Sequence, residues 1–181
     1  MVNIDILRVL WKKFPIFDFA NDQAMTEKKI NIRFQEYKSL EEMDEQDRLL
    51  AQEAIKAMRG SYAPYSHFNV GAAVRMSNGK TVRGANQENA AFPSGLCAER
   101  TAMFSAGAQY PDKDMESIAL AGGVMGRLTQ EPATPCGACR QVMAQYQAKS
   151  GKPMSVIMVG GSRIWKFGKV DDILPLIFDS I

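Results

Sequence analysis

Cysteine and histidine are scarce in this 181-residue chain, which contains three cysteines and one histidine. An odd number of cysteines cannot all pair into disulfides, and a closed structural zinc site requires four ligands that are normally cysteine or histidine. The single histidine, His67, lies outside both cysteine motifs. A lone histidine beside Pro64 and Phe68 is more often a loop or core residue than a ligand, so we exclude His67 from the candidate site.

The sequence also lacks a long apolar run and an excess of one charge. No apolar stretch approaches the roughly 20 residues that a membrane-spanning helix needs. Its 22 basic and 20 acidic residues give a net charge of +2, and the basic residues are scattered, so a nucleic-acid-binding surface is not expected. These absences favour a small-molecule substrate, with no nucleic-acid or membrane partner. Cysteines that stay reduced on a metal suit a cytoplasmic protein.

The three cysteines occur in two short motifs, Cys97-Ala98-Glu99 and Cys136-Gly137-Ala138-Cys139. A Cys-x-x-Cys pair with one distant cysteine suits a zinc ion that takes three protein ligands and keeps its fourth position open to water, as catalytic sites do. Glu99, two residues after Cys97, is a candidate proton shuttle for that water. The sequence therefore predicts one catalytic Zn²⁺ per subunit, bound by Cys97, Cys136 and Cys139, with Glu99 as acid and base.

Both motifs are expected at the beginnings of helices. Pro93 interrupts the chain shortly before Cys97, and Pro135 directly precedes Cys136. The free N–H groups at a helix N-terminus lower the pKa of a thiol, which favours the thiolate that zinc requires. Residues two apart in a helix interior point away from each other, so Cys97 and Glu99 can converge only if Cys97 is at the cap or in the first turn.

Charge counting predicts a role for two arginines. Three thiolates around a dication leave one net negative charge, which weakens zinc as a Lewis acid. Arg100 follows Cys97 by three residues and Arg140 follows Cys136 by four, each on the helical face of its ligand. We expect both guanidinium groups to donate hydrogen bonds to the sulfurs. For each, the alternative is a solvated surface arginine.

Hydrophobic periodicity and turn residues predict an α/β fold with a mixed sheet and helices on both faces. A capping-box pattern from Ser39 predicts a first helix that ends at Gly60, and Asn78-Gly79 predicts a β-hairpin. The predicted strands are 70–76, 81–86, 117–121, 154–159 and 164–167, and the further predicted helices are 97–108, 136–150 and a single turn at 170–174.

Several segments, in their order and spacing, resemble the cytidine deaminase family, over roughly Asp44 to the C-terminus. They are Tyr62 to Gly71, Asn86 to Ala90, Gly95 to Ala102 and Pro135 to Val142. The resemblance implies a three-layer α/β/α sandwich with a five-stranded mixed sheet, and a homotetramer. It also implies zinc-dependent hydrolytic deamination of cytidine and deoxycytidine to uridine and deoxyuridine, with release of ammonia, in pyrimidine salvage.

The resemblance further implies contacts with a pyrimidine nucleoside. Asn86 and Glu88 match a pair that hydrogen-bonds the ribose 3′-hydroxyl, Phe68 matches an aromatic that packs on the pyrimidine, and Ala98 belongs to the same set. Near the C-terminus, Phe178 matches a residue that enters the site of a neighbouring subunit. For Asn86 and Glu88 the alternative is ordinary turn chemistry, and for Phe68 and Phe178 it is simple packing.

One position departs from the family pattern. Phe92 stands where many members carry a tyrosine whose hydroxyl reaches the 5′ side of the sugar, so that polar contact is missing here.

The length and the 46% apolar content predict one domain. Residues 25–181 are expected to form a single catalytic domain, and residues 1–24 an N-terminal extension. Lys12, Lys13 and Pro15 interrupt the apolar part of that extension, so it lacks the core of a signal peptide. We expect translation to begin at Met25. The alternative is that residues 1–24 form an amphipathic arm that docks on a neighbouring subunit.

Two other functions are compatible with the metal motif. A deaminase for a nucleoside-like antibiotic of the blasticidin type would carry similar cysteines. A structural zinc knob in an interaction module would use them without catalysis, but such a module has no need of Glu99. A tRNA or DNA deaminase is disfavoured because such enzymes usually present His-x-Glu and a basic surface.

Overall fold

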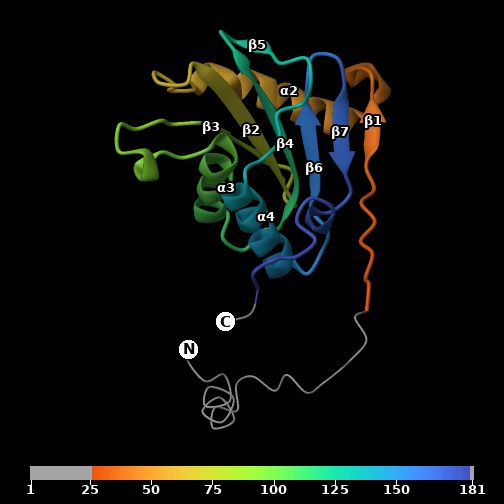
Figure 1. Ribbon diagram of the computed structural model, residues 1–181. Helices are drawn as coiled ribbons and strands as arrows, with labels where there is room; N and C mark the ends of the chain where they lie inside the picture. The colour runs from red at the N-terminus through yellow and green to blue at the C-terminus, as the bar shows by residue number, and fades with distance from the viewer. Residues whose placement is uncertain (1–25, 180–181) are drawn as a thin grey trace, which may run out of the picture. The chain divides into compact units, whose positions relative to one another are not determined.

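A computed structural model describes residues 26–179 (Figure 1). By their contacts, residues 1–30 and residues 31–181 form two units, and the fold below is that of the second unit. The predicted extension, residues 1–24, lies outside the described residues. The proposed start at Met25 therefore stays a prediction.

The second unit contains one mixed sheet in the order β1-β7-β6-β4-β2-β3, with β5 paired to β4 (Figure 1). The strands are β1 Gln35–Tyr37, β2 Phe68–Met76, β3 Thr81–Ala85, β4 Met115–Val124, β5 Arg127–Leu128, β6 Ser155–Val159 and β7 Ile164–Phe167. Strands β4 and β6 pair in parallel, and the other neighbours pair antiparallel. The predicted mixed sheet is confirmed. It has seven strands and not the five expected, because the short strands β1 and β5 extend it.

Three α-helices pack on this sheet: α2 Glu45–Ala57, α3 Ala98–Gln109 and α4 Gly137–Ser150. Four 3-10 turns, η1 to η4, cover Leu40–Glu42, Met58–Gly60, Phe92–Ser94 and Val170–Asp172. The first α-helix starts later than the capping-box pattern predicted. Its N-cap is Asp44, whose carboxylate accepts a hydrogen bond from the Asp47 N–H at 3.0 Å, whereas Ser39 makes no side-chain cap.

Alternation along the central strands places a helix layer on each face of the sheet. In β4, Ile118 and Leu120 point into the core beneath α3 and α4, whereas Ala119 and Ala121 pack toward α2. Figure 1 shows α3 and α4 on the near side of the sheet and α2 behind it. The predicted three-layer α/β/α sandwich is therefore confirmed.

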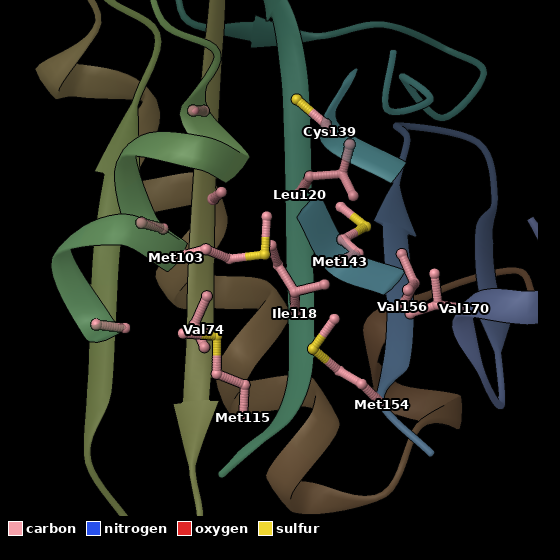
Figure 2. Packing of buried hydrophobic residues seen from close by; sticks show 14 of the residues in the cluster. Val74, Met103, Met115, Ile118, Leu120, Cys139, Met143, Met154, Val156 and Val170 are labelled. Carbon is pink, nitrogen blue, oxygen red and sulfur yellow. The ribbon is translucent and has the colours of Figure 1, made fainter. Parts of the chain in front are cut away.

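Two features fix the helices that carry the cysteine motifs. A Cβ added at Gly84 of β3 would lie 2.3 Å from the Ala102 backbone nitrogen, so only glycine allows α3 to lie this close to the sheet. In α4, Cys139 and Met143 are fully buried and belong to the core beneath this helix. Cys139 lies at one end of that cluster (Figure 2). Both cysteine motifs are thus attached to rigid parts of the fold.

Among the helices of residues 26–179, none combines the length and the apolar character that crossing a bilayer would require.

Candidate metal centre and active site

The two cysteine motifs meet at the N-termini of α3 and α4. Cys97 is the N-cap of α3 and Cys136 is the N-cap of α4, both with extended backbone angles. The predicted helix starts are therefore confirmed. Cys139 lies in the first turn of α4 and is completely buried, whereas Cys136 is exposed and Cys97 is half-buried. Because Cys97 is the N-cap and not an interior helical residue, its side chain can point to the same side as that of Glu99.

The sulfur geometry fits a zinc ion. The Sγ atoms of Cys97 and Cys136 lie 3.9 Å apart, those of Cys136 and Cys139 lie 3.5 Å apart, and all three lie within 4.8 Å of one another. A tetrahedral ion with Zn–S bonds of about 2.3 Å would hold its sulfurs about 3.8 Å apart. This soft donor set suits zinc and does not suit magnesium or calcium, which bind oxygen.

Hydrogen bonds among the thiols favour the thiolate at one position. A hydrogen bond from Cys139, followed by smaller contributions from Arg100 and Cys136, outweighs burial and lowers the pKa of the Cys97 thiol to about 5. The same contact with Cys97, together with burial, raises the pKa of Cys139. Cys97 thus has the ionised form that coordinates metal.

Glu99 is a buried carboxyl group beside these sulfurs. Only 4% of the residue is exposed, and its side chain contacts Cys139. Burial raises the pKa of Glu99, and the charge on Cys97 adds to this effect. A carboxyl group sequestered from bulk water next to a metal site can accept a proton and return it within that site.

The two predicted arginines have different partners. The Arg100 Nη2 atom lies 3.7 Å from the Cys97 sulfur, and the hydrogen bond raises the pKa of Arg100. Arg140 contacts main-chain oxygens instead, because its Nε donates to the Pro135 carbonyl at 2.8 Å and its Nη1 donates to the Ile173 carbonyl at 2.9 Å. Arg140 therefore fixes the loop that leads into Cys136.

An open pocket of about 550 Å³ lies beside Cys97 and Arg100. Asn86 and Glu88, two of the predicted substrate contacts, also line it. Phe68, Ala98 and Phe178 do not. A cavity of this size can hold a ligand as large as a nucleoside next to the sulfur cluster.

The side chains of Asn86 and Glu88 already have protein partners. The Asn86 Oδ1 accepts hydrogen bonds from the Val70 N–H at 2.8 Å and the Ser61 hydroxyl at 2.5 Å, and its Nδ2 donates to the Phe68 carbonyl. These bonds hold the start of β2 in place and leave one amide hydrogen. The Glu88 carboxylate accepts hydrogen bonds from residues 65 and 66.

The other predicted contacts lie outside the pocket lining. Phe68 is half-buried at the start of β2, with its ring against Gly122 of β4, and Ala98 is fully buried at the start of α3. Phe178 is 69% exposed. Its main chain is held from α4, because the Gln141 Nε2 donates to the Phe178 carbonyl at 2.7 Å and the Phe178 N–H donates to the Gln141 Oε1 at 3.2 Å.

Phe92 lies on the rim of the pocket and is 77% exposed. Its ring meets Tyr65 edge to face, with 6.0 Å between the ring centroids. Tyr65 was not predicted as a site residue, and neither was Gln141. The only sequence signal for them is that Tyr65 lies in the segment Tyr62 to Gly71 and Gln141 in the segment Pro135 to Val142, both of which resemble the family.

Comparison with known proteins agrees with this geometry. A family model described as the cytidine and deoxycytidylate deaminase zinc-binding region matches residues 44–152. The cytidine deaminase of Halalkalibacterium halodurans is 48% identical over 103 residues, which cover 57% of this chain and 72% of that protein. The cytidine deaminase of Sporosarcina psychrophila is 40% identical over 100 residues, covering 55% and 68% of the two chains.

Solved structures of cytidine deaminases also align with this chain. The crystal structure of cytidine deaminase from Burkholderia pseudomallei aligns with a TM-score of 0.61 and 38% identity, covering 75% of this chain and all of that one. Cytidine deaminase from Mycobacterium tuberculosis aligns with a TM-score of 0.60 and 28% identity, covering 76% of this chain and 100% of that chain. The matched region contains all three cysteines and Glu99, and the chain belongs to the cytidine and deoxycytidylate deaminase family.

Proposed function

We propose that this protein is a zinc-dependent cytidine deaminase that converts cytidine and deoxycytidine, with water, to uridine and deoxyuridine and ammonia. The proposal rests on one observation. Three sulfurs that can bind a metal lie beside a buried glutamate, at the edge of a pocket large enough for a nucleoside. Its relatives in the comparisons are cytidine deaminases. One Zn²⁺ per subunit would be held by Cys97, Cys136 and Cys139.

The protein's own groups move the protons and hold the charge. Zinc, when bound, supplies Lewis acidity that lowers the pKa of a coordinated water molecule. Glu99 would take a proton from the attacking water, deliver it to N3 of the pyrimidine, and later protonate the departing amine. Arg100 donates to the Cys97 sulfur and so offsets part of the negative charge of the three thiolates. Arg140 would act less directly, through the loop before Cys136.

The substrate contacts form a second part of the proposal. Asn86 and Glu88, which line the pocket, would bind the sugar, and Phe68 and Ala98 would contact the base. Because a carboxylate repels a phosphate, Glu88 favours a nucleoside over a nucleotide. The exposed Phe92 presents no hydroxyl to the 5′ side of the sugar.

Neither alternative function is favoured. A structural zinc knob gives no reason for a buried glutamate and an adjacent pocket. An antibiotic deaminase would share the metal chemistry, but the relatives and solved structures reported above are cytidine deaminases.

An ultraviolet assay tests the proposed activity. We expect the purified protein to convert cytidine and deoxycytidine with a fall in absorbance, and chelation followed by dialysis to abolish at least about 99% of the activity, since the metal supplies several kcal/mol of stabilisation. Added Zn²⁺ should restore it. Blasticidin serves as the competing substrate, and faster turnover of the antibiotic than of cytidine would contradict the proposal.

We further propose a homotetramer in which Phe178 enters the site of a neighbouring subunit. The supporting observation is that an exposed apolar segment, Leu176 to Phe178, is held in a defined position by Gln141. Replacement of Phe178 by alanine should raise KM for cytidine by about tenfold, the effect of losing about 1.4 kcal/mol of aromatic contact. Size-exclusion chromatography with light scattering gives the assembly state. A fully active monomer would rule out this arrangement.

A further inference from the structure

The Glu88 carboxylate is held by a loop more than 20 residues before it in the chain. Its Oε2 accepts hydrogen bonds from the main-chain N–H groups of Tyr65 and Ser66, at 3.0 and 3.2 Å, and its Oε1 accepts one from the Ser66 hydroxyl. These bonds lower the pKa of Glu88, the Ser66 hydroxyl contributing most. Three donors therefore fix the plane of the carboxylate.

The Ser66 hydroxyl also holds the start of β2. Its Oγ accepts a hydrogen bond from the Phe68 N–H at 3.0 Å while it donates to Glu88. The residue between them, His67, has a φ of 55°, a left-handed conformation that side-chain-bearing residues rarely adopt. Such backbone strain persists only where surrounding contacts maintain it, and it often marks functional sites. The hydroxyl thus bridges a pocket-lining carboxylate and the first residue of a central strand.

The Glu88 carboxylate can still accept a hydrogen bond from a ligand. An ionised carboxylate offers about four acceptor positions, of which three are occupied here. One position therefore remains for a ligand hydroxyl. Ser66 and Tyr65 line the same pocket as Glu88, so the donors that orient the carboxylate lie at the site where the ligand would bind.

We propose that Ser66 is a positioning residue for the nucleoside site, whose hydroxyl aligns the Glu88 carboxylate toward a sugar hydroxyl and fixes Phe68 at the same time. The inference rests on the proposed function, because it assigns the pocket to a nucleoside. Its physical basis is preorganisation. Hydrogen bonds within the protein order the Glu88 carboxylate and Phe68 before the substrate binds, so binding loses less conformational entropy.

Replacement of Ser66 by alanine and by threonine tests this role. Alanine removes both hydrogen bonds, and threonine keeps a hydroxyl at the same position. For Ser66→Ala we expect KM for cytidine to rise about tenfold with kcat changed less than about threefold, because ground-state and transition-state binding are lost together. Ser66→Thr should stay within about threefold of the wild type. For 3′-deoxycytidine, which lacks the hydroxyl that Glu88 would bind but still contacts Phe68, Ser66→Ala should lower kcat/KM by clearly less than for cytidine, so discrimination between the two substrates falls.

The controls separate positioning from general damage. Ser162→Ala removes another exposed hydroxyl with a hydrogen bond, to the Gln130 carbonyl at 2.8 Å, and should leave the kinetics unchanged. Zinc content should match the wild type in all variants, and every variant should remain fully folded at the assay temperature. In a double-mutant cycle with Glu88→Gln, the effects of the two changes on cytidine binding should be strongly non-additive.

Two results would overturn the inference. Equal losses for cytidine and 3′-deoxycytidine in Ser66→Ala, or additive effects with Glu88→Gln, would mean that Ser66 does not act through Glu88. These failures leave the proposed deaminase activity intact. A wild-type protein that does not deaminate cytidine would instead overturn both the activity and this role of Ser66.

Discussion

Replacement of Glu99 by glutamine is expected to lower kcat for cytidine by at least about 10⁴-fold. A positioned acid or base typically contributes about 10² to 10⁴ in rate, and this reaction requires several proton transfers by one group. Glutamine keeps the size of the side chain in its buried position but cannot accept and return a proton. The zinc content and the fold should therefore be unchanged, and only turnover should be lost. Steady-state kinetics with metal analysis of the same sample would measure this.

A matched substitution distinguishes this effect from a change of charge. Glu116 in β4 is a half-exposed glutamate outside the site, in an ion pair with Arg75. Glu116→Gln should leave kcat within about twofold, since exposed ion pairs contribute little. If Glu99→Gln kept more than a tenth of the wild-type turnover, the assignment of Glu99 as the proton carrier would be wrong.

Replacement of Cys139 by serine is expected to abolish zinc binding at equilibrium. Loss of an outer-shell partner already costs about 10- to 100-fold in metal affinity, so loss of a ligand should exceed 100-fold. A serine hydroxyl is a harder donor and is not ionised at neutral pH. Metal analysis after dialysis against a zinc buffer should give about one zinc per subunit for the wild type and about a tenth or less for the variant, with activity reduced in proportion.

The burial of the three ligands predicts a further difference among variants. Cys136 is exposed and Cys139 is completely buried, so Cys136→Ser should lose zinc with little other damage. Cys139→Ser should in addition lower the free energy of unfolding of the zinc-free protein by about 1 to 3 kcal/mol, because a hydroxyl costs more than a thiol to transfer from water into the apolar core. Ala138→Ser, between them and exposed, is the control that keeps zinc. A stoichiometric zinc ion in Cys139→Ser would refute the ligand assignment.

Much of the centre could be predicted because its signals are local in sequence. Pro93 and Pro135 mark the starts of the helices that begin with Cys97 and Cys136, and the structure places both cysteines at N-caps. The Asn78-Gly79 turn likewise specified the β2–β3 hairpin, with Gly79 at a φ of 78°. Turn and cap chemistry depends on a few adjacent residues, so a single sequence contains it.

The features that sequence did not reveal depend on distant partners. Strand β1 has only three residues and exists through its pairing with β7, where the Trp165 indole N–H donates to Glu36 at 2.8 Å, 129 residues away in the chain. Strand β5 has two residues after a tight turn. The hydrogen bond from Arg140 to the Ile173 carbonyl and the one from Ser66 to Glu88 likewise join residues more than 20 positions apart. Hydrogen bonds across such separations leave no pattern in a short window of sequence.

The positions of Cys97 and Cys136 have a consequence beyond turnover. They are separated by 39 residues and begin different helices, so an ion bound to both would cross-link two halves of the chain. Metal that binds only the native chain adds its binding free energy to folding. Zinc starvation would then enlarge the fraction of molecules that open locally at the ends of α3 and α4, where proteases act. Cellular abundance of this protein should accordingly follow zinc supply.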